Sequence, residues 1–226
     1  MNTKFTKADR LTGRDNPDVG VYQEILADVQ GVELWPWLNS ELERLLAFDR
    51  YTCIHSIRVA EIARLLASEL GCKQEDIRNI VLGAVLHDLG KLKIPAAVLN
   101  KPGKLSAEEM EIIKQHPVLG EEMLQVKQLP LVVRLIIYQH HERWDGRGYP
   151  DVLQGLQIHQ FAQIVAVADI FDALTAVRPY RAELPRQIAC EMVLAGAGTD
   201  FDEEVVEAFR RVFDPRQNSG AFSLTK

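Results

Sequence analysis

The chain has 226 residues, with 26 lysines and arginines against 32 aspartates and glutamates and a formal net charge of -6. This length is sufficient for one large buried core, and the absence of a clustered basic run argues against polymeric nucleic acid as a partner. The three cysteines lie far apart, which argues against a disulfide framework or a cysteine zinc site. Because no stretch has the unbroken apolar character of a signal peptide or a membrane span, we expect a cytoplasmic protein without membrane insertion.

Apolar residues recur at intervals of three and four along most of the chain, which predicts an all-α fold. Residues 1–45 are predicted to form an N-terminal helical extension, residues 46–215 one domain and residues 216–226 a tail. The helices expected in chain order are 42–48, 51–70, 74–87, one opened by a capping box of Ser106 and Glu109, one opened by Pro117, and then 131–141, 160–176, 185–195 and 202–213.

Local signals give the ends of the first helices. Ser40 and Glu43 form a capping box for the helix at 42–48. Gly71 is expected to stop the next helix, and Gly90 is expected to end the one after it in the left-handed conformation. That ending leaves His87 and Asp88 at a helix terminus, which is a suitable place to present ligands.

Two runs combine imidazoles with carboxylates: HDLGK at 87–91 and HHERWDGRGYP at 140–150. Of the six histidines, only His159 has no support as a ligand and is expected to be structural. Imidazole and carboxylate ligands without thiolate suit iron, manganese, zinc or nickel. Five histidines and two aspartates exceed the needs of one ion, so we expect two ions with Asp88 as the bridge between them.

Asp169 and Asp172 lie three residues apart in an otherwise apolar helix. Buried carboxylates need partners, and a metal would provide one for Asp169. Arg178 or Arg181 would provide one for Asp172. The alternative is that Asp172 forms a structural ion pair with an arginine that only fixes the helix.

The two runs, together with KPGKL, KQHPVLG, AVADIFDALTAVRPYR and FDEEVVEAF, resemble the HD-GYP phosphodiesterases, a branch of the HD superfamily. The resemblance covers about residues 48–213, and the eleven-residue GYP run is far more specific than a bare HD doublet. It implies an HD-superfamily helical bundle with a GYP loop and extra C-terminal helices. It also implies a centre of two or three metals, usually iron or manganese, that hydrolyses the bacterial signalling nucleotide cyclic di-GMP to pGpG and often onward to GMP.

The resemblance carries over to individual residues. Lys91 matches the lysine that reaches the scissile phosphate, and Tyr51 stands where three-metal versions have a glutamate, so two divalent ions are expected: iron or manganese, with nickel and zinc as alternatives. The matched metal ligands are His55, His87, Asp88, His116, His140, His141 and Asp169. The matched substrate contacts are Tyr149, Asp172, Arg178 and Arg181.

The expected reaction uses a hydroxide that bridges the two ions, with Asp88 and Lys91 as catalytic residues. One alternative is a catalytically weak effector that binds cyclic di-GMP, or an interaction module for a diguanylate cyclase-type protein, with a homodimer as a further candidate assembly. Another is a general HD phosphohydrolase of nucleotide triphosphates or alarmones, against which the GYP run and RPYR argue.

Overall fold

The computed structural model describes residues 35–125, 129–176 and 183–214 of the chain. These residues form α-helices and two short 3-10 helices, and within them the only β contacts are isolated bridges. The predicted all-α fold is therefore confirmed. No helix in the described ranges combines the length and the apolar character needed to traverse a bilayer.

The helices follow one another with short connections, and most of them lie within a few residues of the predicted ranges. In chain order they are α3 Trp35–Phe48, α4 Arg50–Glu69, α5 Gln74–Leu86, η1 Leu89–Lys93, α6 Ala96–Leu99, α7 Ala107–Ile113, α8 His116–Gln125, α9 Leu131–Gln139, η2 Gly155–Gln157, α10 Gln160–Thr175, α11 Arg186–Ala195 and α12 Glu203–Phe213.

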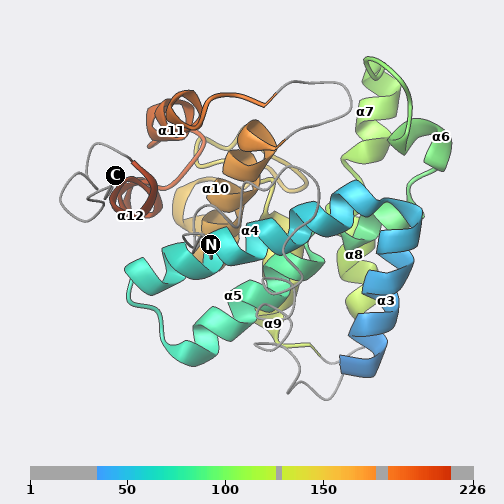
Figure 1. Ribbon diagram of the computed structural model, residues 1–226, viewed down its shortest axis with the longest axis horizontal. Helices are drawn as coiled ribbons and strands as arrows, with labels where there is room; N and C mark the ends of the chain where they lie inside the picture. Colours follow the sequence, from blue (N-terminus) through green and yellow to red (C-terminus); the bar gives the residue numbers. More distant parts are fainter. Residues whose placement is uncertain (1–34, 126–128, 177–182, 215–226) are drawn as a thin grey trace, which may run out of the picture.

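Helix α4 is the central element of the bundle. It packs against α5 and α10 along its length, with α3 near one end and α12 near the other (Figure 1). Its Ile57, Val59 and Leu66 are almost fully buried, and each such side chain contributes about 1.5–3 kcal/mol of transfer free energy. The core therefore fixes α4 and α10 relative to each other, and these two helices carry His55 and Asp169.

Helix α3 begins earlier than the sequence predicts. Pro36 lies in its first turn, where backbone N–H groups have no acceptor within the helix. The proline lacks an N–H, so it costs no helical hydrogen bond at this position. Ser40 consequently lies inside the helix, and the predicted capping box is wrong. Leu38 and Leu42 belong to the same core as α4, and the predicted boundary at residues 45 and 46 falls within α3. The division of the chain into three parts stays a prediction.

Two glycines at helix ends behave differently. Gly71 has a φ of 73° and ends α4 in the left-handed conformation, as predicted. Gly90 is not among the glycines with positive φ and lies in η1, so that prediction is wrong. A Cβ at Gly90 would collide with the carbonyl oxygen of His116 and the amide nitrogen of Gly120. Glycine is required here because η1 and α8 touch through their backbones, and this contact brings His116 towards Asp88.

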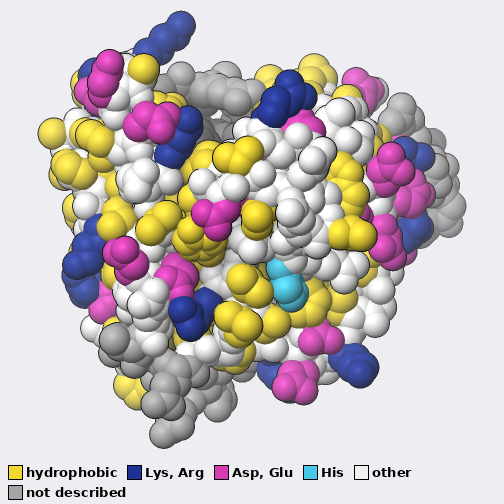
Figure 2. All heavy atoms as spheres, turned by 180° about the vertical axis from the view of Figure 1, so that it is seen from behind, with side chains coloured by type: hydrophobic (Ala, Val, Ile, Leu, Met, Phe, Trp, Pro, Cys, Tyr) yellow, Lys and Arg dark blue, Asp and Glu magenta, His cyan; other side chains and the backbone are white. Residues whose placement is uncertain are grey.

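The surface carries charges of both signs. On the face shown in Figure 2, basic side chains are dispersed among acidic ones. The described residues on this face therefore form no continuous basic stripe of the kind that follows a nucleic-acid backbone.

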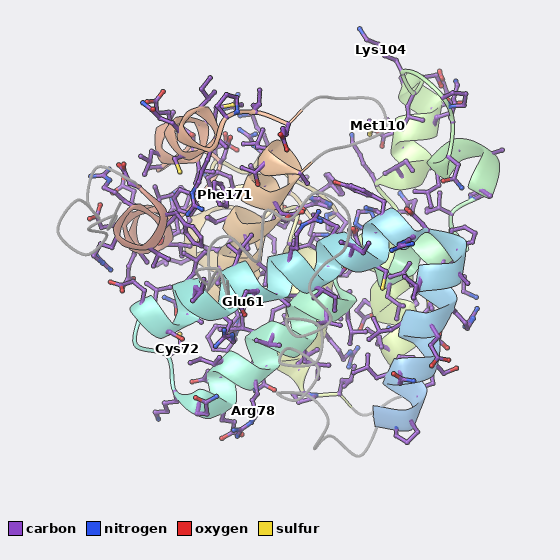
Figure 3. The ribbon with its side chains drawn as sticks, in the orientation of Figure 1. Glu61, Cys72, Arg78, Lys104, Met110 and Phe171 are labelled. Carbon is purple, nitrogen blue, oxygen red and sulfur yellow. The ribbon has the colours of Figure 1, made fainter. Side chains whose placement is uncertain are left out.

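The segment with α6 and α7 projects from the bundle. Neither helix contains a buried residue, and Lys104 lies at the outer tip of the segment (Figure 3). The predicted capping box of Ser106 and Glu109 is present at the start of α7. The inner side of this segment contributes Leu99 and Ile113 to one wall of a cavity.

Candidate metal centre

The seven predicted metal ligands come together in one buried cluster. They come from α4, the C-terminal end of α5, the start of α8, the end of α9 and the middle of α10. Three overlapping groups have ligand atoms that all lie within 4.8 Å of one another. The groups are His55, His87 and Asp169; His87, Asp88 and His140; and His116, His140 and His141.

Three of the imidazoles are oriented by main-chain carbonyls at helix ends. A carbonyl oxygen only accepts a hydrogen bond, so each Nδ1 carries a proton, and in the neutral ring each Nε2 keeps its lone pair. The last carbonyls of a helix have no partner inside the helix and are free to accept. The contacts are His87 Nδ1 to Ala84 O at 2.7 Å, His116 Nδ1 to Ile113 O at 2.8 Å and His140 Nδ1 to Ile137 O at 2.8 Å.

The Nε2 atoms that remain point at one another. His116 Nε2 and His140 Nε2 lie 3.2 Å apart, and the buried Nε2 of His87 has no hydrogen-bond partner. Facing lone pairs in a dry interior are unfavourable without a positive charge beside them. Neutral imidazole nitrogens in this arrangement are suitable ligands for a divalent metal ion, so the residues fit the predicted metal centre.

Asp88 lies between the two ends of the cluster. Its Oδ2 is 3.4 Å from His87 Nε2 and 3.9 Å from His55 Nε2, while its Oδ1 is 3.3 Å from His116 Nε2. The two oxygens therefore face different groups of histidines. This orientation is the one that a bridging carboxylate needs.

His55 differs from the other imidazoles because side chains contact both of its nitrogens. Its Nε2 lies 3.0 Å from Asp169 Oδ1, and its Nδ1 lies 2.7 Å from Asp172 Oδ2. Arg58, one turn further along α4, donates to both oxygens of Asp172, from Nε at 2.5 Å and from Nη2 at 2.9 Å. Among the described residues, Asp172 thus pairs with Arg58. Arg178 and Arg181, the partners expected from the sequence, lie outside the described residues, so their pairing with Asp172 stays a prediction.

Burial sets the protonation of most of the histidines. It lowers the pKa of His116 to about 3 and that of His141 to about 4. Burial and the neighbouring His141 also hold the pKa of His140 well below its usual range. For His55 burial acts in the same direction, but the hydrogen bonds to Asp169 and Asp172 outweigh it and raise the pKa to about 9.

The carboxylates remain ionised although they are buried. Burial opposes their charged form, but Lys91 and the neighbouring imidazoles lower the pKa of Asp88 well below its usual range. For Asp169 the hydrogen bond from His55 has the same effect. Ionised carboxylates beside mostly neutral imidazoles are the protonation states from which metal ligands bind.

The cluster opens into a cavity of about 440 Å³, which is within the usual size range of small-molecule sites. Lys91 lines it and places Nζ 2.6 Å from Asp88 Oδ2. Tyr149 lines it too and packs on His141, with ring centroids 4.8 Å apart. Tyr51 also lies on the wall, its ring stacked against His55 at 6.1 Å.

The loop that carries Tyr149 is held by a buried side chain. Glu142 is 4% exposed and accepts hydrogen bonds from the backbone of Asp151 at 2.6 Å and Leu153 at 3.0 Å. Gly148 packs so closely on the backbone of residues 141–143 that a Cβ there would collide with it. These contacts keep Tyr149 next to His141.

Two predicted substrate contacts differ in their surroundings. Tyr149 faces the cavity, whereas Asp172 is 3% exposed and is not one of the residues that line it. Its contact with substrate stays a prediction. Arg58 was not singled out in the sequence, although its position three residues after His55, on the same helical face, is a signal that points to it.

The fold and the cluster together define an all-α domain built around a candidate metal centre. A family model described as HD domain matches residues 35–205. The chain therefore belongs to the HD domain family, and the resemblance to its HD-GYP branch is confirmed.

Two curated relatives and one solved structure illustrate the similarity. The cyclic di-GMP phosphodiesterase response regulator RpfG of Xanthomonas campestris pv. campestris (strain 8004) is 43% identical over 175 residues, which are 76% of this chain and 46% of that protein. The 3'3'-cGAMP-specific phosphodiesterase 1 of Vibrio cholerae serotype O1 is 42% identical over 138 residues, 61% of this chain and 32% of that protein. The chain thus spans less than half the length of these two relatives.

The structure of Bd1817, an HDG"Y"P protein from Bdellovibrio bacteriovorus, superimposes with a TM-score of 0.60 at 22% identity, over 78% of this chain and 60% of that one. At this identity the likeness supports the fold alone. The HD-superfamily bundle expected from the resemblance is therefore confirmed.

Proposed function

We propose that the chain hydrolyses cyclic di-GMP to pGpG, GMP or both at the cluster of histidines and aspartates. The observation that carries this proposal is the cavity of about 440 Å³ that is lined at once by His55, Asp88, His116, His141 and Asp169 of the cluster and by Lys91. A small anion bound in this cavity would contact both the metal-ligating side chains and the ammonium group of Lys91. The two curated relatives are named as phosphodiesterases of cyclic di-GMP and of 3'3'-cGAMP. A cyclic dinucleotide is therefore the proposed substrate class.

Two divalent ions, iron or manganese with nickel or zinc as alternatives, are the proposed cofactors. His55, His87 and Asp169 would hold one, and His116, His140 and His141 the other, with Asp88 shared between them. Each end then has enough protein ligands to leave a coordination position open for substrate or water. When bound, such ions activate a water nucleophile and neutralise the phosphoryl oxygens.

Lys91 and Tyr149 are proposed to orient the substrate. The side chain of Lys91 is 21% exposed, so its ammonium group can reach a phosphoryl oxygen in the cavity and stabilise the charge that develops on the leaving oxygen. Tyr149, held against His141, presents an aromatic ring on which a nucleobase can stack. Arg178 and Arg181 remain proposed contacts to the second phosphate or to a guanine edge.

Hydrolysis of a nucleotide panel tests this proposal. Metal-free protein, reloaded anaerobically with Mn²⁺ or Fe²⁺, would be incubated with cyclic di-GMP, 3'3'-cGAMP, cyclic di-AMP and GTP, and the products separated by chromatography. We expect metal-dependent conversion of cyclic di-GMP to pGpG or GMP and no attack on GTP. Faster hydrolysis of 3'3'-cGAMP than of cyclic di-GMP would overturn the substrate assignment.

The same assay distinguishes the enzyme from the alternative function. A catalytically weak effector would bind cyclic di-GMP saturably without turnover and act through contact with a diguanylate cyclase-type protein or a second copy of the chain. Binding without product in fully metal-loaded protein would therefore replace the proposed enzyme by this effector. The intact set of seven candidate metal ligands favours the enzyme.

A further inference from the structure

His55 stands apart from the other imidazoles of the cluster in how it is oriented. His87, His116 and His140 each donate from Nδ1 to a carbonyl oxygen near the C-terminal end of a helix, where carbonyls lack a helical partner. His55 lies within α4, which extends from Arg50 to Glu69, and there the carbonyls are engaged in the helix. Its orientation must therefore come from a side chain on another helix.

Asp172 of α10 supplies that contact, with Oδ2 lying 2.7 Å from His55 Nδ1. A carboxylate at the end of a short side chain can still rotate, and a rotation would move the imidazole with it. Arg58 prevents this because it grips both oxygens of Asp172, from Nε at 2.5 Å and Nη2 at 2.9 Å. A two-pronged contact of this kind fixes the carboxylate plane as well as its position.

The three side chains therefore form one connected series, from Arg58 through Asp172 to His55, whose Nε2 lies 3.0 Å from Asp169 Oδ1. The series is nearly closed to solvent, since the side chains of Arg58 and Asp172 are 18% and 4% exposed. Both oxygens of Asp172 are already occupied. This leaves Asp172 suited to hold another side chain and poorly placed to contact a ligand in the cavity.

We propose that Arg58 is a positioning residue, which acts through Asp172 to hold His55 in the orientation needed for metal binding. The proposal rests on the metal centre proposed above, and it gives Asp172 a role different from the substrate contact that the resemblance implies. Side chains that orient a ligand from behind typically change metal affinity 10- to 100-fold when removed. The effect should be confined to the ion held by His55, His87 and Asp169.

The chain offers a matched control on the same helix. Arg64 makes a two-pronged contact with Glu61, at 2.8 and 2.7 Å, and the two side chains are 23% and 4% exposed. Figure 3 shows Glu61 on α4. Neither residue belongs to the groups of candidate metal ligands. Replacement of Arg64 therefore removes an equivalent buried ion pair without affecting His55.

The test is Mn²⁺ binding to the metal-free full chain, measured by titration calorimetry without any nucleotide. We expect Arg58→Gln to weaken one of two ions 10- to 100-fold and to leave the other unchanged. Asp172→Asn should do the same, and the double variant should be no weaker than the worse single variant, because both changes break one series. Arg64→Gln should bind Mn²⁺ as the unmodified protein does.

A second variant keeps the test independent of whether the glutamine protein folds. Arg58→Lys retains a charge but loses the two-pronged contact, so an affinity between those of the unmodified protein and Arg58→Gln is expected. Unchanged affinity in Arg58→Lys, or an equal loss in Arg64→Gln, would overturn the role of Arg58. Failure of the unmodified protein to bind Mn²⁺ would overturn the metal centre itself, whereas failure to hydrolyse cyclic di-GMP would leave this binding result intact.

Discussion

The Nε2 atoms of His116 and His140 lie 3.2 Å apart, while the Nδ1 atoms of both rings donate to main-chain carbonyls. A hydrogen bond between the two Nε2 atoms would require one ring to carry two protons. Burial opposes this and lowers the pKa of His116 to about 3. A cation that binds both lone pairs resolves the conflict.

Mn²⁺ should stabilise the metal-free protein strongly. An ion that binds only the folded state at about 100 times its dissociation constant contributes about 2.7 kcal/mol. In a chain of this size that corresponds to a rise in Tm of roughly 5 to 10 °C. Scanning calorimetry with and without Mn²⁺ measures it. His159→Ala should keep the full rise, because His159 caps α10 and belongs to none of the groups of candidate ligands. A protein whose Tm does not respond to any divalent metal would contradict the centre.

Asp88→Ala should abolish both metal binding and hydrolysis. The two oxygens of Asp88 face opposite ends of the cluster, and without them neighbouring cations would repel each other. The helical content should be retained, because the shortened side chain needs no new space. Elemental analysis and turnover, measured on the same sample, check this. Two ions per chain and near-native turnover in the variant would exclude Asp88 as the bridge.

The metal-free protein should lose stability in mild acid. The pKa values of His116 and His141 are lowered by burial to about 3 and about 4, whereas an unfolded histidine titrates near 6.5. Below about pH 6.5 the unfolded state therefore takes up more protons than the folded state, and each of these groups costs about 1 kcal/mol per pH unit. His55 has the opposite sign: its raised pKa of about 9 stabilises the fold below about pH 6.5, and this is lost as the pH rises towards 9.

Urea unfolding in the presence of a chelator, between pH 8 and pH 5, measures this dependence. His141→Gln removes one of the titrating groups and should make the acid-side slope shallower. A free energy of unfolding that stays constant from pH 6.5 to pH 5 would show that these imidazoles are not buried in their neutral form.

Gly90→Ala should disturb both the fold and the metal site. Its Cβ would collide with the carbonyl oxygen of His116 and force η1 away from α8, at a cost of about 1–3 kcal/mol. Gly103→Ala is the control, since its Cβ meets no atom within 4 Å and only its φ of 105° is strained, which costs about 1–2 kcal/mol. Chemical unfolding should show the larger destabilisation in Gly90→Ala, and Mn²⁺ titration should show weaker metal binding in that variant alone.

The sequence was most informative where several residues of one chemical kind recur in a recognisable pattern. Histidines without thiolates predicted the cluster, and the helical periodicity predicted α4 and α10, which position His55 and Asp169. It was less informative where the outcome depended on what packs opposite. The need for glycine at position 90 comes from the backbone of α8, and the partner of Asp172 is an arginine more than a hundred residues earlier in the chain. Spacing places Arg58 on the same face of α4 as His55, but it does not show that the arginine meets Asp172 of α10, nor that η1 and α8 touch at position 90.

Metal-dependent hydrolysis at this cluster can be tested by titrating the metal-free chain with Mn²⁺ in the presence of cyclic di-GMP and following product formation at each step. We predict no hydrolysis without metal and turnover that rises until two ions are bound per chain. Equal hydrolysis in the absence of metal, or no hydrolysis of cyclic di-GMP with both ions bound, would contradict this prediction.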